Sequence, residues 1–297
     1  MSYVFYNGSF ILKNQCLFDI ENRSFRYGDG LFETIKVINK KIHYLQYHNQ
    51  RLYESATLLS LNSQPIIDVL NNTLFDFLSF SVKSVIDKLL DINNLSDCVA
   101  RLILFRSDAS SGYLPLNHNL WNICVETNKY DFNINPSTSC KNCDSFDKNL
   151  SYFKNFETLK DLITIDTKQK AIISPIIRVF NPSLPVFSKT ANSMQFVMAK
   201  LQADSLGMFD GLMINNNGFL CEFSSGNLFF VKNQLLHTPH CNNGIVKGVM
   251  RSFIIDFLKT KNIVVNEANF TIQDLQNADE IYFTNSIRGI IPIEIMF

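Results

Sequence analysis

Glycine is scarce in this chain, and its placement constrains the fold more than any other feature. Eleven of the 297 residues are glycine. Six of them lie in one stretch, namely Gly207, Gly211, Gly218, Gly226, Gly244 and Gly248. Glycine adopts positive φ angles and close backbone approaches at little steric cost. We therefore expect this stretch to hold tight turns, or a ligand packed against the backbone. Gly28 and Gly30, on either side of Asp29, predict a second such point.

The N-terminal third has the pattern of strands followed by a helix. Asn7 and Gly8 are a strong hairpin signal between two apolar runs, residues 4–6 and 10–12. Alternating side-chain character predicts a half-buried strand over 32–38. A helix face is predicted from side chains that recur at helical spacing: Leu45, His48, Leu52, Ser55, Ala56 and Leu59.

A linker signal suggests where the chain divides. An apolar, β-prone run over 98–105 ends shortly before residues 108–119, which are rich in Ser, Gly and Pro. A new apolar strand is expected to begin at Trp121. We therefore predict a boundary near residue 117, with an N-terminal α+β domain over 1–117 and a C-terminal domain over 118–297.

The second half has the pattern of a meander of short antiparallel strands. Turn signals separate its apolar runs, at 212–214, 219–223, 227–231 and 235–238. A helix over 245–257 and a strand over 280–283 are expected to follow. The polar segment 129–170 is predicted to be an insertion or a partly helical surface. Together the patterns favour two α+β domains with an active cleft between them.

Composition narrows the function classes. Apolar residues make up 46% of the chain, too many for a disordered protein. Lys and Arg number 27 and so do Asp and Glu, which leaves no positive footprint for nucleic acid. Seven cysteines without framework spacing predict a reduced, cytoplasmic protein. Neither a signal-peptide pattern nor a run of about 18 apolar residues is visible, so no membrane association is expected.

Two motifs in the glycine-rich stretch carry candidate chemistry. Residues 244–251 (GIVKGVMR) lead into a helix, where free backbone N–H groups can receive a phosphate. An ordinary loop before a helix has the same pattern. Glu222 lies at the end of an apolar strand, so an inward-facing carboxylate would need a positive partner such as a cationic ring nitrogen. An outward-facing Glu on an amphipathic strand is the alternative.

Two basic residues are further candidates. Lys189 has apolar neighbours and precedes a predicted helix, which suits imine chemistry, although many other lysines are present. Arg51 lies beside the inward stripe of its helix, where a guanidinium can hold a phosphate, or else it is a solvated flank residue. The CxxC over 140–143 lacks a second ligand pair, so no metal is expected. GxGxxG, P-loop and GxSxG motifs are also missing from the sequence.

Taken in chain order, these motifs resemble those of the fold-type IV family of pyridoxal-phosphate enzymes. That family contains branched-chain and D-amino-acid aminotransferases and aminodeoxychorismate lyase. The matching segments are 26–34 (RYGDGLFET, similar to YGDGxFET), 48–52 (HNQRL, similar to HxxRL), Lys189 at the Schiff-base lysine, Glu222 with 227–229 (NLF), and 248–251 (GVMR, at the phosphate turn). The resemblance covers nearly the whole chain.

The resemblance implies a fold, a cofactor and a set of site residues. It implies a two-domain α+β enzyme like D-amino-acid aminotransferase, with a small N-terminal α/β domain, a larger C-terminal domain with a β-barrel-like core, and a homodimeric assembly. The cofactor-binding residues for pyridoxal 5'-phosphate would be Arg51, Lys189, Glu222, Asn227, Val249 and Met250. The substrate-binding residues would be Tyr27, Phe32, Arg106 and Asn285.

The implied roles follow the chemistry of each group. Lys189 would be the catalytic residue that carries the cofactor and shuttles protons at the substrate carbon. Glu222 would keep the pyridine nitrogen protonated, so that the ring accepts electrons. Arg51 and the N–H groups of Val249 and Met250 would anchor the phosphate.

Several details resemble the lyase more than the aminotransferases. Asn192 is similar to the asparagine of the lyase's KxxNR stretch, and Asn285 falls at the asparagine of its FxCNxxxxxxP end. Met194 occupies the place of an aminotransferase tyrosine, and Gly226 that of a second glutamate in branched-chain enzymes. Arg106 resembles part of the lyase's RGxGxRGY stretch, but the residues that follow it depart from the pattern.

Three functions are therefore weighed. The first is a lyase that takes a small amine, 4-amino-4-deoxychorismate, to 4-aminobenzoate and pyruvate in folate biosynthesis. The second keeps the cofactor but transfers an amino group from branched-chain or D-amino acids to a 2-oxo acid. The third is a non-catalytic relative, which the intact Lys189, Glu222 and Arg51 disfavour.

Overall fold

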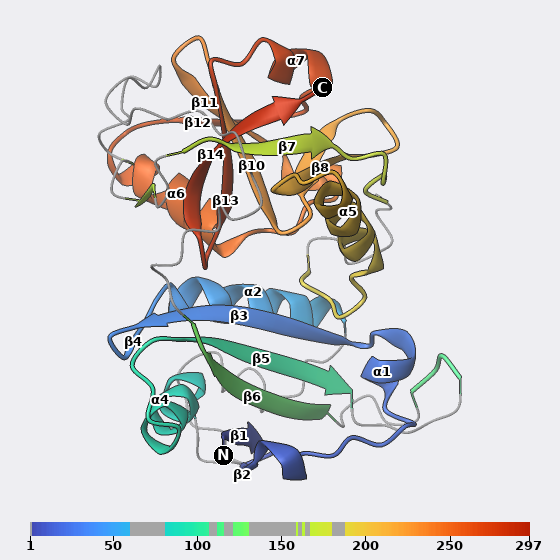
Figure 1. Ribbon diagram of the computed structural model, residues 1–297, viewed down its shortest axis with the longest axis vertical. Helices are drawn as coiled ribbons and strands as arrows, with labels where there is room; N and C mark the ends of the chain where they lie inside the picture. The colour runs from blue at the N-terminus through green and yellow to red at the C-terminus, as the bar shows by residue number, and fades with distance from the viewer. Residues whose placement is uncertain are drawn as a thin grey trace. The chain divides into compact units, whose positions relative to one another are not determined.

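The computed structural model describes residues 2–59, 81–106, 112–115, 121–130, 159, 162–163, 167–179 and 188–297. The chain forms two compact units (Figure 1). Unit 1 contains residues 1–132 and 188–193, and unit 2 contains residues 133–187 and 194–297. Each unit has its own sheet and its own buried apolar cluster.

The first unit is built on a six-stranded antiparallel sheet. Its strands are β1 (Tyr3–Tyr6), β2 (Ser9–Leu12), β3 (Gly30–Ile38), β4 (Lys41–Ile42), β5 (Cys98–Arg106) and β6 (Trp121–Lys129), in the order β2-β1-β6-β5-β3-β4. Its helices are η1 (Lys13–Gln15), α1 (Arg23–Tyr27), α2 (Leu45–Leu58) and α4 (Val82–Ile92). The predicted hairpin is confirmed, because Asn7 and Gly8 both have positive φ, 45° and 92°, as a tight two-residue turn requires.

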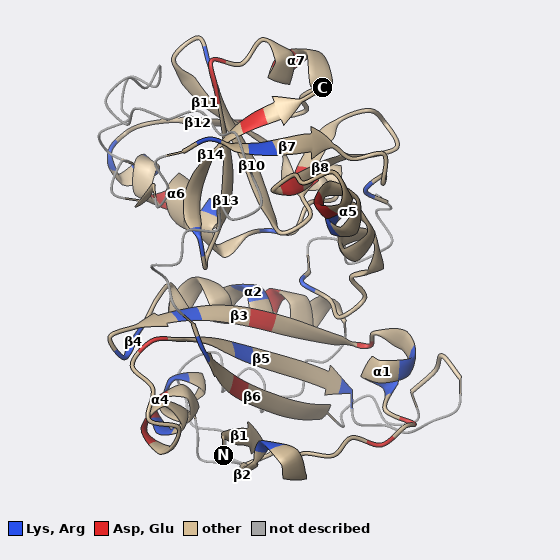
Figure 2. Cartoon of the chain, in the orientation of Figure 1, with Lys and Arg blue, Asp and Glu red and all other residues tan. Residues whose placement is uncertain are grey.

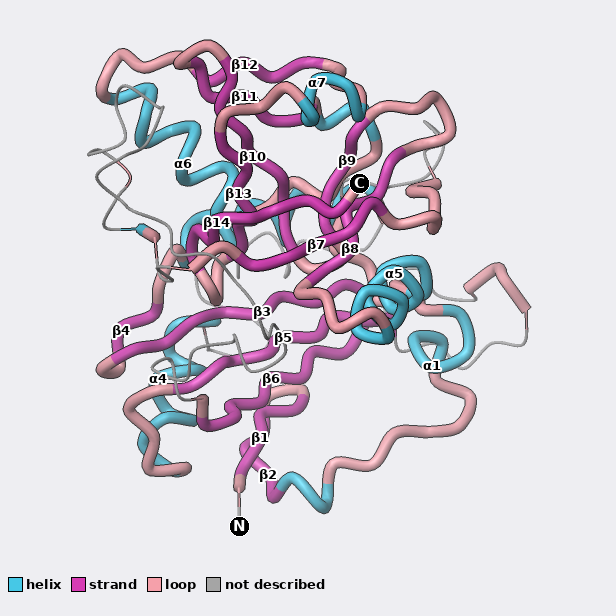
Figure 3. The backbone as a smooth tube through the Cα atoms, turned by 45° about the horizontal axis from the view of Figure 1, so that its top comes forward, coloured by secondary structure: helices cyan, strands magenta, loops and turns pink. Residues whose placement is uncertain are grey.

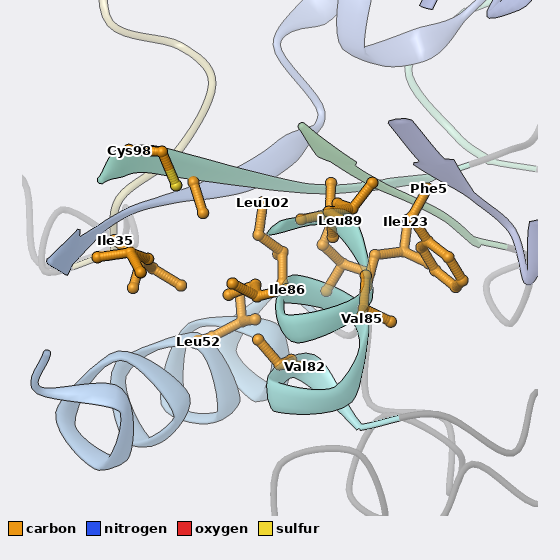
Figure 4. Close-up of a cluster of buried hydrophobic side chains, with 14 of the residues drawn as sticks. Phe5, Ile35, Leu52, Val82, Val85, Ile86, Leu89, Cys98, Leu102 and Ile123 are labelled. Atoms are coloured by element: carbon orange, nitrogen blue, oxygen red, sulfur yellow. The ribbon is translucent and has the colours of Figure 1, made fainter. Parts of the chain in front are cut away.

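One face of this sheet packs on two helices. Alternate residues of β3, among them Leu31, Ile35 and Val37, are buried, because successive side chains of a strand point to opposite faces. These side chains pack with Leu52 of α2 and Leu89 of α4 (Figure 4). The opposite face carries the intervening residues of β3, and both β3 and α2 agree with the predicted strand over 32–38 and the predicted helix face.

The division of the chain lies later than predicted. β6 was expected to open the C-terminal domain, but it pairs with β5 along its whole length, from Cys98 opposite Lys129 to Arg106 opposite Trp121. It therefore completes the sheet of unit 1. The predicted boundary at residue 117 and the CxxC over 140–143 lie outside the described residues, as does most of the segment 129–170.

Unit 2 is built on a closed barrel. Its strands are β7 (Gln169–Ile173), β8 (Asp210–Ile214), β9 (Leu220–Phe223), β10 (Gly226–Lys232), β11 (Leu235–Pro239), β12 (Val265–Ala268), β13 (Glu280–Asn285) and β14 (Gly289–Met296). The pairings β10-β13-β14-β7-β8-β9 return to β10 and close a six-stranded ring (Figure 3). The β-barrel-like core expected for this part of the chain is confirmed.

Large apolar side chains fill the barrel and helices surround it. Phe223, Phe230 and Phe283 are fully buried in its core cluster. The helices of this unit are α5 (Met194–Ser205), η5 (Cys241–Asn243), α6 (Val249–Thr260) and α7 (Ile272–Gln276). α6 begins four residues later than the predicted helix over 245–257, because η5 ends at Gly244 with φ of 89° and Gly248 is extended.

Charge and hydropathy are distributed as the composition suggests. Acidic and basic residues are interspersed over the elements of both units (Figure 2). Among the described residues, no helix has the length and apolar character of a membrane span. The five cysteines in the described part of the chain are all free thiols.

Candidate active site

Residues 188–193 attach to the edge of β3 and so bring Lys189 into unit 1. The Phe32 N–H donates to the Lys189 carbonyl oxygen at 3.0 Å, and the Ala191 N–H donates to the Gly30 carbonyl oxygen at 2.9 Å. Thr190 and Leu31 form the bridge between these two bonds. The segment is therefore a short antiparallel addition to the sheet, and its backbone fixes the position of Lys189.

The turn before β3 depends on glycine. Gly28 ends α1 with φ of 68°, and a Cβ on it would lie 3.0 Å from backbone atoms of Asn192. Only glycine combines this left-handed conformation with so close an approach. The early glycine pair in the sequence thus marks the contact between α1 and the lysine segment.

The Phe32 ring is close to two cationic groups. Lys189 Nζ is 4.2 Å from the centre of the Phe32 ring, and the Arg101 guanidinium carbon is 4.8 Å from it. Both distances are in the range of cation–π attraction. Phe32 was predicted to contact substrate, whereas Arg101 was not singled out. The strand pattern could have indicated Arg101. It lies between Ala100 and Leu102, which are buried, so its side chain points to the opposite, exposed face. An amine and an exposed guanidinium beside one ring suit a substrate that carries a carboxylate.

Arg51 and His48 share the buried carboxylate of Glu33. Arg51 Nε and Nη2 lie 2.8 and 2.6 Å from the two Glu33 oxygens, and His48 Nδ1 lies 2.6 Å from Oε2. All three side chains are buried. Burial alone would raise the pKa of Glu33, but the Arg51 charge and the bonds from His48 and Arg51 outweigh it and bring that pKa to about 2. The Glu33 carboxylate therefore binds one edge of the Arg51 guanidinium. The predicted contact of Arg51 with a phosphate stays a prediction.

The same carboxylate fixes the tautomer of His48. An ionised carboxylate only accepts hydrogen bonds, so Nδ1 of His48 donates and Nε2 carries the lone pair. Burial, outweighing the Glu33 carboxylate, lowers the pKa of His48. Its Nε2 is buried and has no hydrogen-bond partner among the described residues. His48 is thus a neutral imidazole at the base of α2.

Arg106 and Tyr27, both predicted to bind substrate, support the turn between α1 and β3. Arg106 Nε lies 3.1 Å from Asp29 Oδ2, and its Nη2 donates to the Leu59 carbonyl oxygen at 2.8 Å. Arg23 Nε also binds Asp29, at 2.8 Å. The Tyr27 hydroxyl accepts from the Gly112 N–H at 3.3 Å. Contact of Arg106 or Tyr27 with a substrate stays a prediction.

In unit 2, Glu222 is a buried carboxylate on the outer side of the barrel. Its neighbour Phe223 points into the barrel core, so Glu222 points the other way. Arg178 Nε lies 3.2 Å from Glu222 Oε1, and the Val246 N–H donates to the same oxygen at 2.9 Å. Both charged side chains are buried. The two charges balance each other, and the hydrogen bond from Val246 adds the further partner that a buried ion pair needs. Arg178 was not predicted, because nothing in its local pattern distinguishes it from other basic residues.

Asn227 and Gly248 shape the start of α6. Asn227 Nδ2 donates to the Val246 carbonyl oxygen at 2.9 Å and lies 3.4 Å from Glu222 Oε2. Its Oδ1 fills the space that a Cβ on Gly248 would need. Gly248 is the N-cap of α6 and has no side chain that could accept a hydrogen bond. The N–H groups of Val249 and Met250 in the first turn therefore have no capping acceptor at this residue. A helix end of this kind is suited to an anion, and the contact of Val249 and Met250 with a phosphate stays a prediction.

Asn285 closes the turn between β13 and β14. Its Oδ1 accepts from the N–H groups of Ile287 and Arg288 at 3.1 and 2.7 Å, and its Nδ2 donates to the Ser225 carbonyl oxygen at 3.0 Å. Asn285 therefore ties this turn to the loop between Glu222 and Asn227. Its predicted contact with a substrate stays a prediction.

The fold and these groups define a mixed α+β protein with a candidate lysine nucleophile and with a buried carboxylate near the uncapped start of a helix. The amino-transferase class IV family matches residues 30–295, and the chain belongs to this family. Its enzymes depend on pyridoxal 5'-phosphate, and a solved structural neighbour carries pyridoxamine 5'-phosphate. A buried acid held by Arg178 suits a pyridine nitrogen, and the start of α6 suits a phosphate, so the residues of unit 2 fit this cofactor.

Individual relatives have different activities. The chain is 27% identical over 294 residues to a putative branched-chain-amino-acid aminotransferase of Methanocaldococcus jannaschii, covering 98% of this chain and 86% of the relative. It is 27% identical over 274 residues to the aminodeoxychorismate lyase of Vibrio harveyi, covering 92% and 84%. The solved branched-chain aminotransferase of Escherichia coli shares the fold with a TM-score of 0.77 at 20% identity, covering 99% of this chain and 86% of that one.

The Glu33 cluster makes the stability of unit 1 sensitive to acid. The lowered pKa of His48 means that the unfolded chain binds more protons below about pH 6.5, so stability falls as the pH drops past that value. The Glu33 contribution is complete above pH 4.5 and is lost as the pH falls toward 2. Urea unfolding followed by the fluorescence of Trp121, the single tryptophan, should show this decline between neutral pH and about pH 3.

Two variants test the assignment. Glu33→Gln should be less stable at neutral pH and should lose much of the pH dependence in the acid range. Asp87→Asn, which removes a surface ion pair with Lys83 in the same unit, should leave the slope unchanged. An unaltered slope in Glu33→Gln would show that this carboxylate does not control the acid response.

The Arg178–Glu222 pair should be strongly coupled. Arg178→Met leaves a buried carboxylate without its cation, and we expect a loss of about 3–5 kcal/mol in the free energy of unfolding. The double variant Arg178→Met/Glu222→Gln should lose less than the two single changes together. Urea unfolding followed by circular dichroism measures these values, with the exposed Lys259→Met as control. Simple additivity of the two changes would contradict the coupling.

Proposed function

We propose that this chain is a pyridoxal-phosphate-dependent lyase that converts 4-amino-4-deoxychorismate to 4-aminobenzoate and pyruvate, in the cytoplasmic synthesis of folate. The main support for this proposal is the lack of space for a side chain at Gly226. An added Cβ on Gly226 would lie 2.5 Å from ring atoms of Phe283 and 2.6 Å from the Thr284 carbonyl oxygen. The second glutamate that the resemblance places here in branched-chain aminotransferases therefore has no room on this backbone.

Position 194 supports the same choice. Met194 is 67% exposed at the start of α5 and has no hydroxyl group, whereas the resemblance places a tyrosine there in aminotransferases. Asn192 and Asn285 agree with the lyase pattern. The lyase substrate also carries carboxylates, for which the Arg101 guanidinium beside Phe32 is a suitable partner.

The proposed reaction assigns a separate role to each of several residues of the chain. When bound, pyridoxal phosphate supplies an electron-accepting ring. Glu222, kept in place by Arg178, would hold the proton on the ring nitrogen. The N–H groups at the start of α6, together with Arg51, would hold the phosphate. Lys189 Nζ would take a proton from the substrate ring and deliver one to the departing three-carbon acid, and aromatisation would drive the step.

Amino-group transfer between an amino acid and a 2-oxo acid is the second candidate, favoured by the likeness to the M. jannaschii relative. The two reactions share every proposed cofactor contact and differ in the substrate.

The decisive experiment measures both activities. We expect the purified holoenzyme to release pyruvate from 4-amino-4-deoxychorismate, and Lys189→Ala to release none. We expect no bleaching of the visible cofactor absorbance by a panel of L- and D-amino acids. Bleaching by an amino acid, without pyruvate release from the chorismate derivative, would establish the aminotransferase instead.

We also infer that the chain forms a homodimer. The apolar residues Val197, Met198 and Leu201 of α5 recur at helical spacing yet are 46–57% exposed, and an apolar stripe of this kind is typical of an association surface.

Sedimentation should therefore give the mass of two chains. Leu201→Asp should yield single chains, because a charge would be buried in the apolar contact. Ser205→Asp, at the exposed end of the same helix, should remain dimeric. A single-chain mass for the unaltered protein would contradict the assembly.

A further inference from the structure

Two thiols that the proposed reaction does not use lie on the face of the unit 1 sheet opposite α2 and α4. Cys124 is on β6, directly opposite Tyr6 of β1 and Ile103 of β5. Residues directly opposite one another share a face of the sheet, and that face is the one away from the buried Val125. Cys16 follows η1, in the segment that leads from the first hairpin toward α1.

The flanking contacts place Cys16 at the level of Cys124. Before it, Lys13 Nζ binds Glu126 Oε2 at 2.7 Å. After it, the Phe18 ring lies 5.7 Å from the ring of Phe105, which is paired with Asn122. The segment 13–18 therefore follows β6 from position 126 to position 122, with Cys16 between these two points.

The local helix turns the Cys16 side chain toward the same strand. The Cys16 N–H donates to the Lys13 carbonyl oxygen at 3.3 Å, which closes a 3₁₀ turn. In a 3₁₀ helix, side chains three residues apart eclipse one another. Because the Lys13 side chain reaches β6, the Cys16 side chain is directed to β6 as well.

The electrostatics agree with this placement. Burial, followed by the charge of Cys16 and a side-chain hydrogen bond with it, raises the pKa of the Cys124 thiol to about 12. Burial and then the charges of Cys16 and Cys124 raise the pKa of Tyr6, the residue opposite Cys124. The two thiols and this phenol thus form one cluster.

The two cysteines differ in access to solvent. Cys16 is half-buried, whereas Cys124 is 7% exposed. A more accessible thiol next to a protected one is the arrangement of a peroxide-reactive cysteine and its resolving partner. Neither residue belongs to the set assigned to the cofactor or the substrate.

We propose that Cys16 and Cys124 are a dithiol oxidation site, at which a peroxide converts the two thiols to an intramolecular disulfide. The Cys16 sulfur attacks hydrogen peroxide and becomes a sulfenic acid, releasing the first water. The Cys124 sulfur then displaces that hydroxyl group, whose oxygen leaves as the second water with the Cys124 proton. Two thiols are oxidised and one peroxide is reduced.

The bond would join the segment before α1 to the middle of the sheet. A disulfide that closes a loop of roughly 100 residues stabilises the fold mainly by restricting the unfolded chain. Oxidation should therefore raise the unfolding temperature of unit 1, which Trp121 on β6 reports by its fluorescence.

The experiment uses the holoenzyme with Cys140→Ser and Cys143→Ser, because these two cysteines form a competing CxxC. After treatment with hydrogen peroxide, we expect two fewer alkylatable thiols per chain and a proteolytic product in which Cys16 is joined to Cys124. Reductant should restore both thiols, and the oxidised protein should unfold at a higher temperature than the reduced protein.

Variants in the same background complete the test. Cys16→Ser and Cys16→Ala at this half-buried position should form no bond and show no rise in unfolding temperature on oxidation. Cys241→Ser, which removes a half-buried thiol of unit 2, should oxidise like the parent. Joining of Cys16 to any other cysteine, or oxidation of Cys16 to a sulfinic acid without a bond to Cys124, would overturn the proposal.

Discussion

The attachment of six residues to the edge of β3 is the interaction on which the rest of the site depends. Residues 188–193 are flanked on both sides by chain that belongs to unit 2, yet their backbone groups bond to Gly30 and Phe32. This pairing sets the position of Lys189 beside the Phe32 ring and requires glycine at position 28. The amine proposed to react is therefore positioned by main-chain pairing together with the contact of its own side chain with the Phe32 ring.

In the described part of each unit, a buried carboxylate is paired with a buried arginine. Glu33 is paired with Arg51, and Glu222 with Arg178. Isolated buried charges are costly, so both pairs need the added hydrogen bonds, from His48 in one unit and from Val246 in the other. Arg51 and Glu222, which are proposed for the cofactor site, are thus also buried within their units. A change at either of them would therefore affect stability as well as activity.

Elements with local sequence signals were predicted correctly. Features that depend on residues far away in the sequence were not predicted. The Asn7-Gly8 hairpin, α2 and the meander from β8 to β11 follow from turn residues and periodicity alone. β14 was not predicted, because Pro292 argues against a strand that is paired on both sides. Arg178 and Arg101 were missed because their importance comes from Glu222 and Phe32, which are far away in the sequence.

The barrel seam has a consequence for how this enzyme responds to mutation. β9 and β10 are joined by only two register pairs, Gly226 with Phe223 and Asn227 with Glu222. The acid proposed for the ring nitrogen is thus part of a short pairing that closes the barrel. A substitution deep in the apolar interior, such as at Phe283 against Gly226, would shift that joint and weaken cofactor retention without touching any polar group.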